Sequence, residues 1–139
     1  MEDRPCTYRV STKAVIKNGD GKILLMRERD GQWELPGGGL DHGEDPRDAL
    51  RREISEEIGC KADWISDQPI AFWSIRKEVG SPELKWFAFV AYEVKITGEL
   101  KLNKDETEGM EVVEDAGYFS PEEAKTLKLH DNVKPFFAY

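Results

Sequence analysis

Hydrophobic and polar residues alternate along the first third of the chain, which predicts short β-strands. The pattern indicates one strand over residues 8–16 and a second over residues 22–27. Between them, Asn-Gly-Asp-Gly at residues 18–21 supplies residues that tolerate a positive φ, as a hairpin turn requires. A short strand over residues 33–35 then meets Pro36 and three glycines, where regular structure is expected to end.

An amphipathic helix is predicted after the glycines. Asp45 suits the N-cap and Pro46 suits the first helical position, while Gly59 supplies a C-terminal stop. The apolar stripe of this helix consists of Leu50, Ile54 and Ile58.

The second half of the chain returns to strand patterns. Residues 69–78 and 85–95 read as strands separated by a turn at residues 80–83, and the second of them is apolar on both faces, as an interior strand should be. Residues 112–119 are a further candidate. A capping box at residues 120–123 predicts another helix, and the C-terminal aromatic residues are expected to pack on the core. Hairpins with few helices indicate an α+β or mixed α/β sandwich.

Composition bounds the possible functions. The chain has 139 residues, 39% of them hydrophobic, which suits one domain over residues 1–139. Lys and Arg total 20 against 28 Asp and Glu, so a formal charge of -8 argues against binding a long nucleic acid. The sequence shows no membrane-spanning run and no signal peptide, and its two cysteines favour a reduced cytoplasmic setting.

Three glutamates on the predicted helix are the first candidate for chemistry. Glu53, Glu56 and Glu57 have the spacing i, i+3, i+4, which stacks them on one surface. At roughly 100° per residue, Glu57 falls about 20° from Leu50, at the border of the apolar stripe. A buried carboxylate needs a counter-charge, and Arg52 is expected to partner only one of the glutamates. A divalent metal ion that prefers oxygen ligands is therefore predicted among them.

The glycines and the helix together resemble the 23-residue box of the Nudix (MutT-like) hydrolase family. The matching residues are Gly38, Glu44, Arg52, Glu53, Ile54, Glu56, Glu57 and Gly59. The one departure is Cys60, where the family usually has Ile, Leu or Val, and a buried cysteine behaves as a small hydrophobe.

This resemblance implies a Nudix-type α/β/α sandwich with a mixed sheet and the box as loop-helix-loop. It also implies that Glu53, Glu56 and Glu57, with the Gly38 carbonyl, hold Mg²⁺ or Mn²⁺, and that Arg52 orients a glutamate while Glu44 braces the loop. Family members take their general base from a box glutamate, here Glu53, or from a later loop. The later-loop candidates are Glu111, Glu114, Glu106 and Glu108.

Substrate contacts are less constrained by the sequence. Arg27, Arg29 and Lys13 are candidates for phosphate contacts, although each also suits an exposed surface. Trp33 is a candidate for stacking on a base, as are Phe72, Trp73 and Trp86, and a core role is the alternative for each.

The resemblance implies hydrolysis of a diphosphate linkage in a small nucleotide. We predict a nucleoside triphosphate pyrophosphohydrolase, with an oxidised or otherwise non-standard nucleotide as one candidate substrate. The alternatives are an ADP-ribose or nucleotide-sugar pyrophosphatase and a nucleotide-binding sensor that does not hydrolyse its ligand. No membrane partner is expected, and relatives of this kind often form homodimers.

Overall fold

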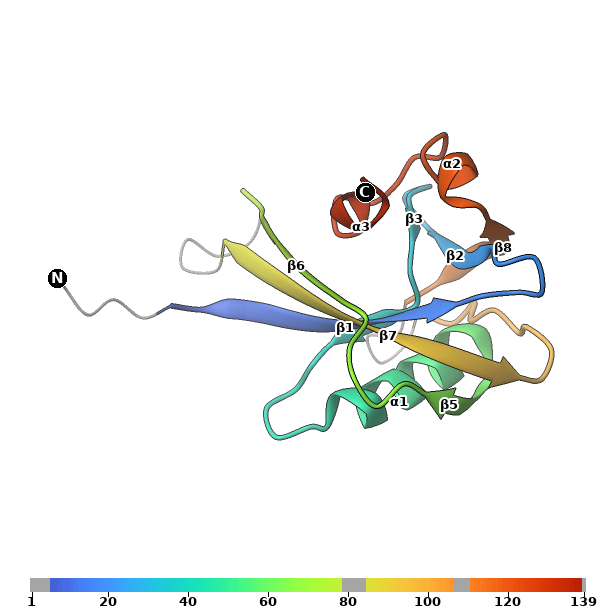
Figure 1. Cartoon of the computed structure of the whole chain (residues 1–139), viewed down its shortest axis with the longest axis horizontal. Coiled ribbons are helices and arrows are strands. Elements are labelled where there is room, and N and C mark those ends of the chain that lie inside the picture. The colour runs from blue at the N-terminus through green and yellow to red at the C-terminus, as the bar shows by residue number, and fades with distance from the viewer. Residues whose placement is uncertain (1–5, 79–84, 107–110, 139) are drawn as a thin grey trace, which may run out of the picture.

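The computed structural model describes residues 6–78, 85–106 and 111–138. It has a mixed α+β fold, as predicted, with two sheets and one long helix (Figure 1). The first sheet contains β1 (Tyr8–Ile16), β4 (Gly37–Gly39), β5 (Lys61–Ile65), β6 (Ala71–Arg76) and β7 (Trp86–Thr97). The second contains β2 (Ile23–Glu28), β3 (Trp33–Glu34) and β8 (Val113–Phe119).

Strand β7 is the centre of the first sheet, which confirms its prediction as an interior strand. It runs parallel to β1 along the whole of that strand and antiparallel to both β5 and β6. The turn predicted at residues 80–83 lies outside the described residues.

The predicted hairpin between the first two strands opens after one bridge. Asn18 and Lys22 close the turn with a backbone hydrogen bond of 2.9 Å, and Lys17 bridges to Ile23. Beyond that point β1 joins the first sheet and β2 the second, where β2 lies between β3 and β8. The split leaves room between the two sheets for side chains from both strands.

The expectation that regular structure ends at the glycines is wrong. Gly37–Gly39 forms β4 and pairs antiparallel with β1, so that Gly37 lies opposite Lys13 and Gly38 opposite Thr12. Glycine is required here because a Cβ on Gly37 would lie 2.0 Å from the Thr12 carbonyl oxygen. Strand β5 was not predicted; its single alternation of apolar residues is too short to stand out from a loop.

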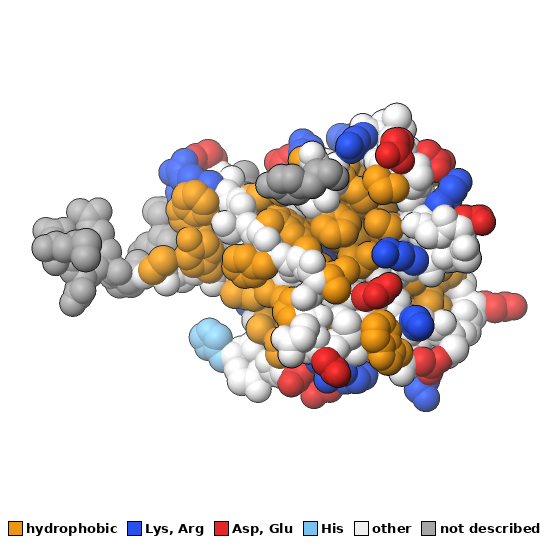
Figure 2. All heavy atoms as spheres, viewed as in Figure 1, with side chains coloured by type: hydrophobic (Ala, Val, Ile, Leu, Met, Phe, Trp, Pro, Cys, Tyr) orange, Lys and Arg blue, Asp and Glu red, His pale blue; other side chains and the backbone are white. Residues whose placement is uncertain are grey.

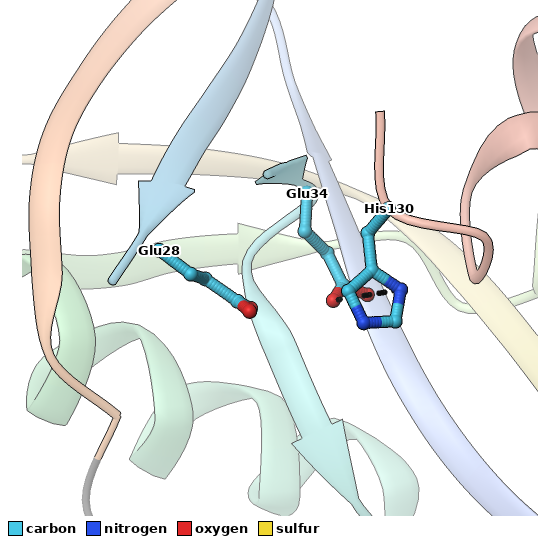
Figure 3. A group of neighbouring side chains, drawn as sticks. All are labelled: Glu28, Glu34 and His130. Atoms are coloured by element: carbon cyan, nitrogen blue, oxygen red, sulfur yellow. Dashed lines mark ion pairs between the residues drawn. The ribbon is translucent and has the colours of Figure 1, made fainter. Parts of the chain in front are cut away.

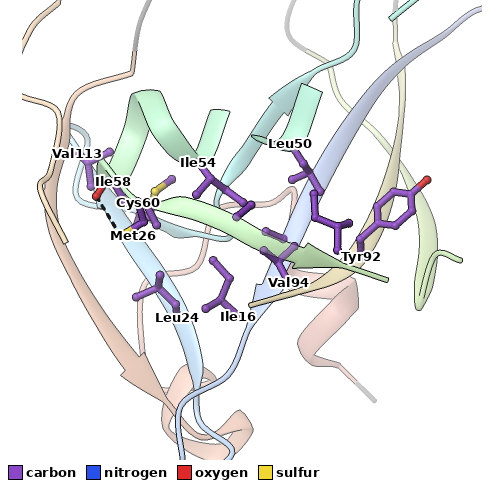
Figure 4. Packing of buried hydrophobic residues seen from close by; sticks show 13 residues of the cluster. Ile16, Leu24, Met26, Leu50, Ile54, Ile58, Cys60, Tyr92, Val94 and Val113 are labelled. Atoms are coloured by element: carbon purple, nitrogen blue, oxygen red, sulfur yellow. Dashed lines mark hydrogen bonds between the residues drawn. The ribbon is translucent and has the colours of Figure 1, made fainter. Parts of the chain in front are cut away.

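Helix α1 (Pro46–Ile58) packs one face on the first sheet. Asp45 caps it by accepting hydrogen bonds from the amides of Arg47 and Asp48, and Gly59 ends it with a φ of 66°. Its buried stripe meets side chains from β1, β2 and β7 in the larger core cluster (Figure 4). The labelled members of that cluster are Ile16, Leu24, Met26, Leu50, Ile54, Ile58, Cys60, Tyr92, Val94 and Val113.

Two helices of four residues each, α2 (Pro121–Ala124) and α3 (Lys134–Phe137), complete the chain. The predicted capping box is present, with Ser120 and Glu123 exchanging hydrogen bonds. Phe137 is 3% exposed in a second core cluster, which confirms that the C-terminal aromatic residues pack on the core. None of the three described helices combines the length and apolar character needed to span a lipid bilayer.

Candidate functional site

A cavity of about 430 Å³ lies where helix α1, strand β4 and the space between the two sheets meet. One wall, here called the box wall, comes from β4 and α1. Its residues are Gly37, Gly38, Gly39, Arg52, Glu53 and Glu56. The facing wall comes from β1, β2, β3 and two later segments. Its residues are Ser11, Lys13, Glu28, Glu34, Glu111 and Asn132.

Glu57 lies behind the box wall and is 2% exposed, as the helix geometry predicted. Its Oε1 accepts a hydrogen bond of 2.9 Å from the Gly37 amide. Burial raises the pKa of Glu57 well above its usual value, against the opposing effects of Lys13 and the Gly37 amide. The carboxyl group therefore lacks enough positive charge from the protein to be readily ionised.

Arg52 contacts more glutamates than the sequence suggested. It binds both carboxylate oxygens of Glu44 at 3.1–3.2 Å, and its Nη1 also lies 3.1 Å from Glu53 and 3.6 Å from Glu56. The expectation of a single partner is wrong because the planar guanidinium offers donors in several directions. Glu44 in turn accepts a hydrogen bond from the Asp41 amide, so that it links Arg52 to the loop before α1.

Glu53 and Gly38 are in close contact across the box wall. A Cβ on Gly38 would lie 2.6 Å from Glu53 Oε1, so glycine lets the backbone approach this carboxylate. Burial raises the pKa of Glu53, which Arg52 lowers and Glu56 raises further. Carboxylate and backbone oxygens are the ligands that Mg²⁺ and Mn²⁺ prefer, so this donor set fits such an ion.

The facing wall is built around a buried ion pair. Lys13 Nζ lies 2.5 Å from Glu34 Oε1, and the two side chains are 5% and 4% exposed. Burial alone would lower the pKa of Lys13 and raise that of Glu34. Their mutual attraction reverses both directions, so both groups stay ionised.

Glu28 and His130 lie on either side of Glu34 (Figure 3). The Glu28 pKa is raised to about 8 by burial first, then by the charges of Glu34 and Glu111, although Lys13 lowers it. Asn132 donates from its Nδ2 to both Glu34 oxygens at 3.3 and 3.4 Å.

Of the later-loop candidates that the structure describes, only Glu111 lines the cavity, where its side chain is exposed. Glu106 forms an ion pair with Arg29, and Glu114 is exposed on β8. Glu108 lies outside the described residues.

The predicted substrate residues are placed differently. Lys13 reaches the cavity, but Arg27, Arg29 and Trp33 are not among the described residues that line it. Arg27 instead lies 4.0 Å from Asp115 and stacks on Trp33, whose ring packs against Phe119.

The aromatic stacking candidates also lie away from the cavity. Trp73 packs between Phe89 and Phe136 in the core, which confirms the core alternative for this residue. Phe72 and Trp86 are 69% and 44% exposed on the first sheet. Figure 2 shows hydrophobic side chains gathered over the N-terminal ends of β1 and β7, at the left of that view.

Sequence reasoning missed Glu28, Glu34, His130 and Asn132. These residues come from three separate parts of the chain, and no spacing pattern connects them. In the sequence, Trp33 and Glu34 come shortly before Pro36 and the three glycines. Nothing in this local pattern indicates that Glu34 faces Lys13.

The fold and site together define a class of protein: a mixed α+β domain in which a glycine strand and a glutamate-bearing helix form one wall of a polar cavity. Residues 7–139 match the sequence profile of the NUDIX domain. The chain therefore belongs to the NUDIX family.

Individual relatives support the same assignment. An RNA pyrophosphohydrolase of Gluconacetobacter diazotrophicus is 35% identical over 104 residues, covering 58% of this chain and 61% of that protein. The nucleoside triphosphatase NudI of an Enterobacter species is 28% identical over 135 residues, covering 88% and 89%. In solved structures, the E. coli ORF135 protein has a TM-score of 0.71 and 28% identity, covering 94% of this chain and 86% of that one.

The matched segments differ in extent. Three RNA pyrophosphohydrolases are matched over 61%, 34% and 35% of their own lengths. The chain thus spans less than two thirds of each of these relatives, whereas it spans most of the nucleoside triphosphatase.

Proposed function

We propose that this protein is a metal-dependent hydrolase that cleaves a phosphoanhydride bond in a nucleoside triphosphate. The observation that carries the proposal is the box wall, where Glu53 and Glu56 lie beside the glycine strand at one end of a cavity sized for a small ligand. The nucleoside triphosphatase relative, which matches over most of its length, supports this substrate class.

Glu53, Glu56 and Glu57, with the Gly38 carbonyl, would hold Mg²⁺ or Mn²⁺. Such an ion, when bound, neutralises the diphosphate and lowers the pKa of the attacking water. The raised pKa of Glu57 supports this assignment, because the protein alone supplies too little positive charge to balance its carboxylate.

The protein's own residues would set the geometry of the reaction. Arg52 holds Glu53 and Glu56 in place and is itself anchored by both oxygens of Glu44. The hydrogen bond from the Gly37 amide to Glu57 fixes the glycine strand against the helix. These contacts keep the carboxylates oriented before any substrate binds, which lowers the reorganisation that the reaction requires.

Two residues are candidates for the proton acceptor. Burial raises the pKa of Glu53, which strengthens it as a base. Glu111 lies on the facing wall and is exposed, so that it could accept a proton from water in the cavity.

A substrate panel tests this function. It contains nucleoside triphosphates, ADP-ribose, a nucleotide sugar and a 5′-triphosphorylated RNA oligonucleotide, each assayed with Mg²⁺ and with Mn²⁺ and with products identified by chromatography. We expect cleavage of triphosphates that EDTA abolishes. The formal charge of -8 predicts poorer cleavage of the RNA.

Other results would point elsewhere. Cleavage confined to ADP-ribose or to the nucleotide sugar would replace the substrate class. Nucleotide binding without any product would indicate a sensor and contradict hydrolysis.

A further inference from the structure

Asn103 connects the end of helix α1 to the segment that carries Glu111. Its backbone amide donates to the carbonyl oxygen of Glu57 at 2.9 Å, and its side-chain Nδ2 donates to the carbonyl oxygen of Glu111 at 2.7 Å. The same Nδ2 donates to the carbonyl oxygen of Asp105 at 2.9 Å, while Oδ1 accepts from the Asp105 amide at 3.1 Å. One half-buried side chain therefore holds together the backbone at positions 105 and 111.

Backbone contacts on both sides fix Asn103 itself. The Val113 amide donates to the Asn103 carbonyl oxygen at 2.9 Å, and the Lys101 amide donates to the carbonyl oxygen of Ile58 at 2.7 Å. A Cβ on Gly59 would lie 2.8 Å from the Cβ of Lys101, so the glycine that ends α1 lets this segment approach the helix. The side chain of Asn103 is thus anchored to the helix that carries the box glutamates.

Glu111 relies on this junction for its place in the cavity. Its carboxylate forms no hydrogen bond or ion pair with another described residue, so its direction is set by the backbone that Asn103 holds. Burial and the charge of Glu34 raise the pKa of Glu28, and the charge of Glu111 adds to this effect, which places Glu111 close to Glu28. The lone pairs of Glu111 remain available, whereas Glu53 already accepts from Arg52 at 3.1 Å.

We propose that Asn103 is a positioning residue, which holds Glu111 where its carboxylate accepts the proton of the attacking water. This inference rests on the proposed function and selects between its two candidate proton acceptors. When water attacks a phosphorus atom, a new P–O bond forms and the bridging P–O bond breaks. The electron pair of the broken bond stays on the departing phosphate oxygen, and the water proton passes to Glu111. Asn103 is not among the described residues that line the cavity, so it acts through Glu111.

Substitution of each residue tests its assigned role. Glu111 is exposed, so Glu111→Gln should fold, and loss of the proton acceptor should lower kcat by at least about a hundredfold. Asn103→Ala removes the side-chain hydrogen bonds to Asp105 and Glu111 but keeps the backbone bonds to Glu57 and Val113. A misplaced acceptor should lower kcat by at least about tenfold, with KM changed by less than about threefold.

A double-mutant cycle distinguishes positioning from a general structural role. If Asn103 acts only through Glu111, kcat of the Asn103→Ala/Glu111→Gln protein should lie within about twofold of that of Glu111→Gln alone. A further fall of about tenfold would show that Asn103 acts independently and would overturn the proposal. Near-normal turnover of Glu111→Gln would also overturn it and leave Glu53 as the acceptor.

Two more variants guard against an effect on folding. Asn103→Asp keeps an acceptor for the Asp105 amide but lacks the donor to the Glu111 carbonyl oxygen, so it should lose kcat as Asn103→Ala does and decides the matter if the alanine variant does not fold. The matched control is Asn18→Ala. Asn18 likewise organises a turn, with Oδ1 accepting from the amides of Asp20 and Lys22, and is not among the described residues that line the cavity, so kcat should be unchanged.

Metal binding supplies a readout that does not depend on turnover. In calorimetric titration with MnCl₂, Asn103→Ala should keep the affinity of the unmodified protein within about twofold. A fall in affinity that parallels the fall in kcat would assign the effect to α1 and overturn the proposal. Absence of any triphosphate cleavage by the unmodified protein would contradict the proposed function itself. Cleavage that the Asn103 variants leave unchanged would contradict only the role assigned to Asn103.

Discussion

The two walls of the cavity hold their charges in different ways. On the box wall, Arg52 is 39% exposed and shares its guanidinium among Glu44, Glu53 and Glu56, so water and several partners stabilise the charges. On the facing wall, Lys13 and Glu34 are almost completely buried and depend on one another. The first arrangement would let the carboxylates adjust to the proposed metal ion, whereas in the second neither charge has a solvent-exposed partner to replace the other.

The largest expected effect comes from breaking the buried pair of the facing wall. Lys13→Met leaves the Glu34 charge buried without its partner, so we expect the free energy of unfolding to fall by about 3–5 kcal/mol. Chemical denaturation measures the change. The control is Lys17→Met, because Lys17 is 48% exposed and lies 4.0 Å from Glu93, and it should cost less than about 1 kcal/mol. Equal losses for the two variants would show that the buried pair has no special role.

The second test concerns the junction between the walls. Gly37 lies opposite Lys13 in the sheet and donates its amide hydrogen to Glu57, so it links both walls. A Cβ at this position would lie 2.0 Å from the Thr12 carbonyl oxygen, and the φ of 141° disfavours any other residue. We expect Gly37→Ala to reduce the free energy of unfolding by about 3 kcal/mol.

The control for this junction is another glycine with a positive φ. Gly43 has a φ of 80° but open space around its Cα, so Gly43→Ala should cost only about 1 kcal/mol from the backbone conformation. Thermal and chemical unfolding of both variants give the comparison. If Gly37→Ala is no worse than Gly43→Ala, the close approach of β4 to β1 is not needed for stability.

The third test addresses the proposed role of the box wall in catalysis. Glu57→Gln keeps the acceptor for the Gly37 amide and resembles the protonated acid that burial favours, so the fold should be preserved. It removes a negative charge from the proposed metal ligands, and we expect kcat to fall by more than about a hundredfold. Steady-state kinetics at saturating Mg²⁺, with Glu122→Gln as the control, measure the loss. Near-normal turnover in folded Glu57→Gln protein would exclude it as an essential ligand.

The contrast between the walls also explains what the sequence could predict. The box wall derives from a short segment, so helix periodicity placed Glu57 at the edge of the buried stripe, and the caps at Asp45 and Gly59 fixed the ends of α1. Strand β1 has the predicted bounds for the same reason, since its pattern of alternation is local. The metal-ligand roles of the box glutamates remain a prediction.

The facing wall could not be predicted because it depends on topology. Lys13, Glu28 and Asn132 meet only after β1 and β2 enter different sheets and the C-terminal segment folds back over β3. Local pattern likewise misjudged the glycines, because whether they form a strand depends on β1 lying alongside them. Arg27 and Arg29 were plausible phosphate contacts by charge alone, but the pairing of β2 with β8 turns Arg27 toward Asp115.

The smallest expected effect distinguishes the walls by their response to pH. Glu28 has a pKa of about 8 in the folded protein, above its usual value of 4.5. The folded state therefore holds this proton more tightly than the unfolded chain. The resulting stabilisation is fully present below about pH 4.5 and is lost as the pH rises through about 8. Glutamine cannot ionise, so the stability of Glu28→Gln relative to the unmodified protein should increase between pH 5 and pH 9.

Because Glu28 is only half-buried, solvent screening reduces this change. We expect the difference in the free energy of unfolding between the two proteins to change by at least roughly 1 kcal/mol from pH 5 to pH 9, which is less than the full value for a pKa shift of this size. Denaturation of both proteins at each pH gives the difference directly, and Glu122→Gln controls for the loss of one negative charge at the surface. Buried carboxyls that do not interact with Glu28 are common to both proteins and cancel in the difference, whereas Lys13 and Glu34 interact with Glu28 and contribute to the change. A difference that stays constant from pH 5 to pH 9 would mean that Glu28 ionises in the folded state as readily as in water. Water would then stabilise the charge of Glu28 on the facing wall, as it does the charges on the box wall, and the neighbouring side chains would not determine its ionisation.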